Sequence, residues 1–169
     1  MARRSTNGTD VTFEPSFRIA WVYITPEVFK AMVHMDSYVR SNLDPGLLEL
    51  MRIGASQIDH CAFCLGIHAK GAFAAGESVV RVMRLNAWEE PPGCYTEREL
   101  AALDLTEAIT VLTDGFVPSE VYDRVAALFS ETELAHPIAA IVVVNAWNRF
   151  GVAMRKMPGG YAAGAAMMV

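Results

Sequence analysis

Helix-start signals recur along the whole chain, and they leave little room for a β-rich fold. Thr25 and Asp44 each precede a proline, which pairs a capping side chain with a residue suited to the first helical position. Thr96 and Glu99 have the spacing of a capping box. Runs of Val, Ile and Thr bounded by turn residues, which strands would need, are nearly absent. We therefore predict an all-α domain of about seven helices with short connections.

Cap and turn residues set the expected limits of these helices. Asp59 is expected to cap the helix that follows it, Gly76 to end that helix, and Ile24 to pack on Phe29 as a hydrophobic staple. Residues 11–23 lack a clear period and are expected to be extended. The expected helices cover about residues 26–41, 45–58, 60–75, 78–87, 97–113, 119–129 and 133–155, the last beginning in earnest at Pro137.

The length of 169 residues fits one domain. We expect a flexible start over residues 1–10, a helical domain over 11–157 and a flexible tail over 158–169. Hydrophobic residues make up 53% of the chain, which is more than a free monomer needs and predicts a subunit interface or a ligand cavity.

The charge and the cysteine content indicate which partners and which cellular compartment to expect. The formal net charge of -5 argues against general nucleic-acid binding. Three cysteines are too few for a disulfide scaffold and fit a reducing compartment. The basic start has no apolar run behind it, and no apolar stretch is long enough to span a bilayer. We therefore expect a cytoplasmic protein without a membrane partner.

The chemistry is concentrated in Cys61, Cys64 and His68, which would form one stripe along a helix. The two sulfurs would be neighbours, close to disulfide distance, and His68 would lie one turn from Cys64, where it can accept its proton. A thiol with a base beside it and a second thiol in reach has the components for peroxide reduction through a sulfenic acid and a disulfide.

Two other interpretations of this stripe stay open on residue spacing alone. The cysteines can be small buried hydrophobes. They can also join His68 in a zinc site with His60 or Asp59 as a fourth ligand, although no second ligand pair follows along the chain.

The segment from Glu49 to His68, with Ser-Gln-Ile before the CxxCxxxH motif, resembles the core of the AhpD-like alkylhydroperoxidases of the carboxymuconolactone decarboxylase superfamily. Residues 145–149, Asn-Ala-Trp-Asn-Arg, are similar to a segment of its single-domain, peroxidase-related branch. The resemblance covers roughly residues 20–156.

The resemblance implies roles for individual residues. Cys64 matches the peroxidatic cysteine, Cys61 the resolving cysteine, His68 the activating histidine and Glu49 the proton-relay carboxylate, for which we expect burial and a raised pKa. Phe63 stands where the prototype has a second histidine, so one relay element is missing. His60 is a candidate replacement.

One physical argument competes with this assignment of the two cysteines. The helix dipole favours the thiolate of Cys61, which lies nearer the helix start. A base within hydrogen-bond reach acts on the proton of Cys64 directly, so we expect Cys64 to be the attacking thiol.

The resemblance also implies an activity and partners. The expected function is thiol-dependent reduction of alkyl hydroperoxides, an antioxidant peroxidase activity of the peroxiredoxin type. No bound cofactor or metal is expected, because an external dithiol, such as a lipoyl group, restores the thiols. Family members assemble as homo-oligomers, as trimers or hexamers built from dimers. Two alternatives are a lactone decarboxylase of the carboxymuconolactone type and a non-enzymatic oligomeric redox sensor.

The remaining conspicuous side chains are interpreted as structural. They are Cys94, expected to be a bystander, Trp147, expected in the core, Arg149, expected in a salt bridge, and His34 and His136.

Overall fold

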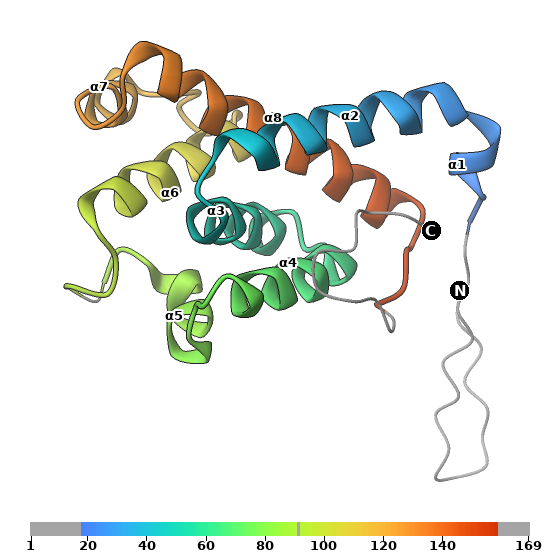
Figure 1. The fold of residues 1–169 in the computed structure, drawn as a ribbon, viewed down its shortest axis with the longest axis horizontal. Coiled ribbons are helices and arrows are strands. Elements are labelled where there is room, and N and C mark those ends of the chain that lie inside the picture. The colour runs from blue at the N-terminus through green and yellow to red at the C-terminus, as the bar shows by residue number, and fades with distance from the viewer. Residues whose placement is uncertain (1–17, 91, 159–169) are drawn as a thin grey trace, which may run out of the picture.

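The computed structural model describes residues 18–90 and 92–158, and every regular element in that part of the chain is a helix. The all-α prediction is therefore confirmed (Figure 1). Residues 1–10 and 159–169, where we predicted flexible ends, lie outside the described residues. The elements are α1 Trp21–Ile24, α2 Pro26–Asn42, α3 Pro45–Ile58, α4 Ala62–Ala74, α5 Val79–Arg84, the 3₁₀ turn η1 Leu85–Ala87, α6 Glu97–Thr110, α7 Ser119–Ala126 and α8 Glu131–Ala153.

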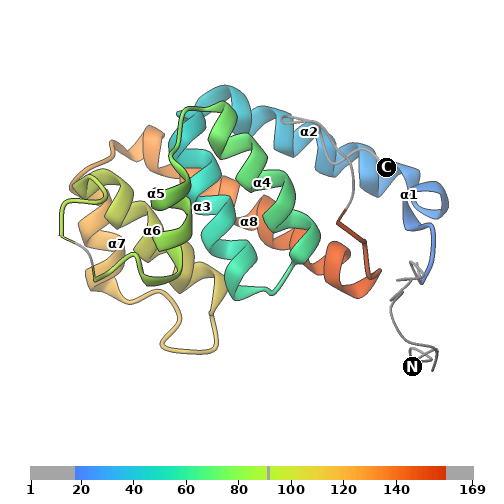
Figure 2. The same ribbon diagram turned by 90° about the horizontal axis from the view of Figure 1, so that it is seen from below.

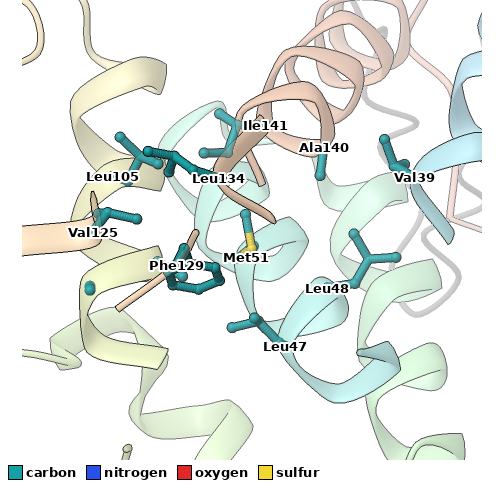
Figure 3. Close-up of a cluster of buried hydrophobic side chains, with 12 residues drawn as sticks. Val39, Leu47, Leu48, Met51, Leu105, Val125, Phe129, Leu134, Ala140 and Ile141 are labelled. Carbon is teal, nitrogen blue, oxygen red and sulfur yellow. The ribbon is translucent and has the colours of Figure 1, made fainter. Parts of the chain in front are cut away.

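Helix α3 is the centre of the fold. It packs against α4, α6 and α8, and α2 lies along α8 (Figures 1 and 2). A first apolar cluster joins α2, α3, α6, α7 and α8 around Met51, Leu105 and Ile141 (Figure 3). Because α3 is covered on several sides, nine of its fourteen residues are buried, including the charged Glu49 and Arg52. In this part of the chain no helix combines the length and apolarity needed to cross a bilayer.

Two of the predicted helix starts are confirmed by the capping hydrogen bonds of the residues named for them. The Asp44 side chain accepts the N–H of Leu47 at 3.0 Å, and Thr96 with Glu99 forms a reciprocal capping box. The prediction for Thr25 is wrong in detail. Thr25 precedes α2, but its hydroxyl donates to the Trp21 carbonyl and leaves the start of α2 without a side-chain cap.

The first and the last helix differ from the predicted ones. Residues Trp21–Ile24 form a short helix where we expected an extended chain. The final helix begins at Glu131, well before Pro137, because Ser130 and Glu133 form a second capping box. Pro137 lies inside the helix, where it removes one backbone N–H donor.

Candidate functional site

The two cysteines of the motif lie at the start of α4 and are joined as a disulfide, with Cα atoms 5.3 Å apart. Cys61 is the N-cap residue, and its sulfur accepts the N–H of Cys64 at 3.3 Å. The exposed fractions of Cys61 and Cys64 are 1% and 0%. The predicted proximity of the two sulfurs is therefore present, inside the protein rather than at its surface.

A turn at residues 59 and 60 precedes Cys61, and because of it the helix starts later than predicted. Asp59 closes α3 instead of capping α4, and the backbone of His60 has a φ of 53°. This left-handed conformation interrupts the helix, so α4 begins only at Ala62. The carboxylate of Asp59 is also engaged elsewhere, because it accepts a hydrogen bond from Asn148 Nδ2 at 3.0 Å.

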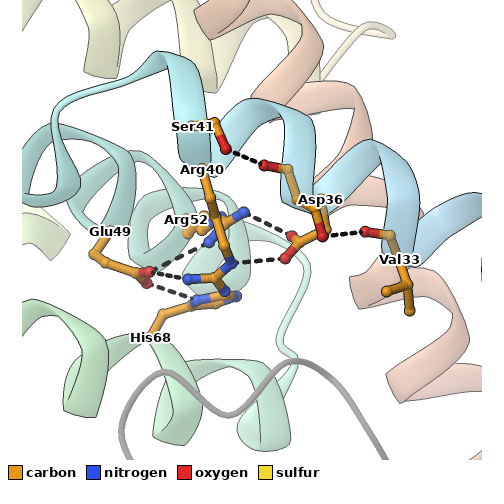
Figure 4. A network of polar contacts seen from close by, with 8 residues as sticks. Val33, Asp36, Arg40, Ser41, Glu49, Arg52 and His68 are labelled. Carbon is orange, nitrogen blue, oxygen red and sulfur yellow. Dashed lines mark hydrogen bonds and ion pairs between the residues drawn. The ribbon is translucent and has the colours of Figure 1, made fainter.

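His68 lies one helical turn beyond Cys64 and is 2% exposed. Its Nδ1 is 2.8 Å from Oε2 of Glu49 on α3 (Figure 4). Its Nε2 is buried and has no hydrogen-bond partner in the described part of the chain. Gly71 allows this close packing of α4 on α3, since a Cβ atom there would be 2.8 Å from Glu49 Cδ. The structure thus places Glu49 and His68 together, as the motif predicted.

Glu49 is buried, as expected, but the expected rise of its pKa is wrong. Burial alone would raise the pKa of this carboxyl, whereas His68, Arg52 and Arg40 together hold it below its ordinary value. Oε1 of Glu49 lies 3.2 Å from Arg52 Nη1 and 3.3 Å from Arg40 Nη1. Sequence reasoning missed these two cations, which act together with His68 to reverse the direction of the pKa shift.

Asp36 on α2 ties the two arginines together. Its Oδ1 lies 2.6 Å from Arg52 Nη2, and its Oδ2 lies 2.7 Å from Arg40 Nε (Figure 4). The i,i+4 spacing of Asp36 and Arg40 and the i,i+3 spacing of Glu49 and Arg52 were visible in the sequence. The contact between α2 and α3 that joins the two pairs was not.

The imidazole of His68 is held neutral by its surroundings. Burial lowers its pKa below the ordinary value of 6.5, and the positive charges of Arg52 and Arg40 act in the same direction. The neighbouring Glu49 carboxylate opposes this fall without overcoming it.

An apolar cluster surrounds the sulfurs on the side of α2 and α8. Met32, Phe63, Ile67, Val143 and Trp147 are its buried members besides the cysteines. Trp147 is 4% exposed, which confirms its predicted place in the core. Beyond it, the rings of Trp21 and Phe150 stack with centroids 3.9 Å apart.

Helix α8 meets the disulfide at Gly151. A Cβ atom at this position would be 2.8 Å from Cys61 Sγ and 3.3 Å from Cys64 Sγ. Only a residue without a side chain lets the backbone of α8 approach the sulfurs so closely.

A polar chain anchors the turn before Cys61 to α8. Asn148 is fully buried, and its Oδ1 accepts the hydroxyl of Ser56 at 3.1 Å while its Nδ2 donates to Asp59. Arg149 Nη1 lies 3.5 Å from the same Asp59 carboxylate, so the predicted salt bridge is confirmed. These contacts hold the turn that precedes Cys61 against α8.

Two further residues of the motif, His60 and Phe63, concern the predicted proton relay. His60 lines a cavity of about 280 Å³ with Gln57, Trp88 and Glu107, and none of Cys61, Cys64 and His68 lines that cavity. Phe63, in the place of the prototype's second histidine, has Lys156 Nζ 4.2 Å from its ring centre. The cavity that His60 lines therefore gives no support to His60 as a replacement for the missing relay histidine.

Cys94, His34 and His136 are the other residues that we interpreted as structural. Cys94 is a free, half-buried thiol with Arg84 Nη1 3.1 Å from its sulfur. His136 lies beside Tyr38, and His34 is exposed on α2. Among the residues that the structure describes, no group of three or more His, Cys, Asp or Glu side chains is arranged to hold a metal ion.

The buried His68–Glu49 pair predicts a loss of stability on acidification. The pKa values of both groups are lowered in the folded protein, below 6.5 for His68 and below 4.5 for Glu49. Each group therefore stabilises the fold above its unfolded pKa, and this contribution falls as the pH drops below 6.5 and then below 4.5. One such proton contributes a slope of up to about 1.4 kcal/mol per pH unit.

Urea unfolding of the disulfide form at closely spaced pH values measures this slope. We expect His68→Gln to reduce the decrease in the free energy of unfolding that begins below pH 6.5. His34→Gln removes an exposed histidine from α2 and is expected to keep the wild-type slope. Equal slopes in wild type and His68→Gln would contradict the prediction.

Comparisons with known proteins agree with the motif and the fold. Residues 26–108, which include Glu49, both cysteines and His68, match the model of the Carboxymuconolactone decarboxylase family. The chain is 37% identical over 142 residues to the uncharacterised protein YdfG of Bacillus subtilis (strain 168), covering 82% of this chain and 95% of that protein. It is 30% identical over 115 residues to the uncharacterised protein YnjA of Escherichia coli (strain K12), covering 68% of this chain and 62% of that protein.

Two crystal structures have a similar fold. One is ATU0492 from Agrobacterium tumefaciens, a protein of unknown function described as a candidate AhpD antioxidant defence protein. It is 32% identical, with a TM-score of 0.81, and the match covers 86% of this chain and all of that one. The other is the debrominase Bmp8 at 19% identity, with a TM-score of 0.73 over 82% of this chain and 75% of that one, which supports the fold alone. The chain therefore belongs to the carboxymuconolactone decarboxylase family, as an AhpD-like member.

Proposed function

We propose that this protein is a thiol-dependent hydroperoxide reductase in which Cys61 and Cys64 are the redox pair. The observation that carries the proposal is the buried cysteine pair at the start of α4, one turn from an imidazole whose other nitrogen is held by Glu49. Membership of an AhpD-like family supports an antioxidant enzyme. The peroxidase activity itself and the roles of the residues are the proposal.

In the reduced protein, the Cys64 thiol gives its proton to Nε2 of His68. The thiolate attacks the O–O bond of the hydroperoxide, so that an S–O bond forms and the O–O bond breaks. The leaving alkoxide takes the proton back from His68 and departs as an alcohol. Cys64 sulfur is thereby oxidised to a sulfenic acid, and the peroxide is reduced by two electrons.

The Cys61 thiol then closes the cycle within the chain. Its sulfur attacks the sulfenic sulfur of Cys64, an S–S bond forms, and water leaves with the hydroxyl and the thiol proton. An external dithiol, such as a dihydrolipoyl group, reduces this disulfide by two thiol exchanges and becomes a disulfide itself. The sum is ROOH plus a dithiol giving ROH, water and the oxidised dithiol.

Cys64 is the attacking thiol in this scheme because it is the cysteine one turn from His68. Cys61, as the N-cap residue, lies further from His68 along α4. The dipole of a helix start contributes up to about 2 kcal/mol at a partly buried site, whereas a base in reach removes the proton directly.

The setting of the enzyme is part of the same proposal. A cycle that ends in a reducible disulfide fits a cytoplasmic protein supplied by a dithiol reductant. Large apolar side chains on one helix, Val28, Met35 and Tyr38 of α2, are about half exposed, at 46%, 45% and 54%. This surface supports a homo-oligomer.

A steady-state assay with an alkyl hydroperoxide and dihydrolipoamide tests the proposal. We expect peroxide consumption to be proportional to enzyme and to stop after alkylation of the reduced thiols. Cys94→Ser is the matched control, because it removes the third cysteine and should retain the wild-type rate.

Two outcomes would replace the proposal. Activity on a carboxylated lactone that is indifferent to thiol alkylation would support the decarboxylase. A disulfide that forms with peroxide, but without repeated turnover with any dithiol, would support a redox sensor.

A further inference from the structure

The guanidinium of Arg52 is buried between two carboxylates from different helices. Arg52 is 1% exposed, and its Nη2 lies 2.6 Å from Asp36 Oδ1 on α2. Its Nη1 lies 3.2 Å from Glu49 Oε1 on α3 (Figure 4). The second oxygen of Asp36 is taken by Arg40, so the Asp36 carboxylate is fully engaged in holding the two arginines.

This arrangement determines which state of Glu49 the site can hold. Arginine does not release its proton in proteins, so a permanent positive charge faces Oε1. The opposite oxygen, Oε2, faces Nδ1 of His68 at 2.8 Å. A carboxyl group that is buried without such partners would tend to take up a proton, and these contacts keep Glu49 ionised instead.

An ionised carboxylate can only accept hydrogen bonds, and this fixes the ring of His68. The contact with Glu49 requires the proton to be on Nδ1, which leaves a lone pair on Nε2 of the neutral imidazole. Nε2 is the ring nitrogen that has no hydrogen-bond partner in the described part of the chain.

We propose that Arg52, anchored by Asp36, is a positioning residue that keeps Glu49 ionised and so holds the His68 ring with its proton on Nδ1 and Nε2 free as a base. The use of Nε2 on the Cys64 thiol rests on the proposed function. The control of the His68 ring by Arg52 does not.

The charged groups around His68 come from several elements. Asp36 and Arg40 come from α2, Glu49 and Arg52 from α3, and Lys156, after α8, lies over the ring of Phe63 on α4. Among them, Arg52 is the buried cation that touches Glu49 directly, and Arg40 is the partly exposed one. Removal of the Arg52 charge therefore favours uptake of a second proton by the His68–Glu49 pair.

The test is a ¹⁵N NMR titration of the His68 ring in the disulfide form, which requires no turnover. We expect Arg52→Met to raise the pH at which the ring takes up its second proton by about one unit. Arg52→Lys keeps the charge and is expected to stay near wild type. Arg81→Met is the matched control, since Arg81 also bridges two carboxylates, Glu77 and Glu99, and is expected to leave the titration unchanged.

Arg52→Met leaves the buried Asp36 with Arg40 as its remaining ion-pair partner, which can destabilise the fold. A second variant is therefore needed. The double variant Asp36→Asn/Arg52→Met removes the pair together, and we expect the same upward movement. An unchanged titration in the folded variant, or an equal rise in Arg52→Lys, would overturn the inference.

The two proposals fail separately. If the titration moves but the wild-type protein consumes no peroxide, the proposed function is wrong and the role of Arg52 on His68 stands. If peroxide is consumed and the titration does not move, the inference about Arg52 is wrong.

Discussion

Replacement of Cys64 by serine is expected to reduce dithiol-dependent peroxide consumption to background, a loss of about 10³-fold or more. A serine hydroxyl in this place keeps nearly the same volume but is not ionised by a neighbouring imidazole at neutral pH, and it forms no sulfenic acid. The measurement is the steady-state assay with an alkyl hydroperoxide and dihydrolipoamide. A Cys64→Ser protein that consumes peroxide at the wild-type rate would rule out the proposed mechanism.

Cys61→Ser is expected to behave differently, because it removes the second step and leaves the first. The protein should consume one equivalent of peroxide per chain and then stop, with a sulfenic acid trapped on Cys64. Mass spectrometry of the protein after a peroxide pulse, in the absence of added thiol, would detect the added oxygen. No peroxide consumption by Cys61→Ser, together with one added oxygen on Cys61 of the Cys64→Ser protein, would reverse the assignment of the two cysteines.

Gly151→Ala is expected to destabilise the disulfide form by about 1–3 kcal/mol, the usual cost of overpacking a core. The added Cβ atom would be 2.8 Å from Cys61 Sγ and 3.3 Å from Cys64 Sγ, and neither sulfur can rotate away while the disulfide is closed. Either α8 or the start of α4 must move. Urea unfolding of the oxidised protein measures the loss, and we also expect slower peroxide turnover.

Gly54→Ala provides the matched control for this substitution. Gly54 is also a helical glycine, on α3, but a Cβ atom there would meet Leu103 at 3.7 Å and Thr106 at 4.0 Å, which are ordinary contacts. Alanine is favoured over glycine in a helix by about 0.5–1 kcal/mol, so this variant is expected to be slightly more stable than wild type. Equal effects of the two substitutions would show that the contact with the sulfurs does not constrain α8.

The helices were predictable where their signals are local. Asp44 before Pro45 and the Thr96–Glu99 box gave the correct starts, because a cap depends on residues within one turn of each other. The start of the final helix also has a local signal, the capping box of Ser130 and Glu133, but Pro137 suggested a later start. The helix nevertheless extends through Pro137 from the capping box at Ser130.

The turn before the cysteines was less predictable. Asp59 has the character of an N-cap residue, yet it closes the preceding helix and bonds to Asn148. Its partner is 89 residues away in the chain, so no local pattern could indicate it. The left-handed backbone after it occurs at His60, so no glycine marks this turn in the sequence.

The site was predicted in its residues but not in its electrostatics. The spacing of Cys61, Cys64 and His68 depends on one helix, and the motif supplied Glu49. Burial of Glu49 predicted a raised pKa, and the opposite is found because His68 bonds to the carboxyl and Arg52 and Arg40 face it. Arg52 shares α3 with Glu49, but its role depends on Asp36 of another helix, which sequence spacing cannot place.

The pairing of Asp36 and Glu49 with Arg40 and Arg52 also affects the proposed chemistry through total charge. Two anions and two cations cancel, so these four residues add no net charge beside a neutral His68 and a neutral Cys64 thiol. Transfer of the thiol proton to His68 creates a thiolate and an imidazolium together and leaves that sum at zero. The reacting anion is thus generated inside the protein without importing an uncompensated charge from water, which is the step that burial would otherwise make most costly.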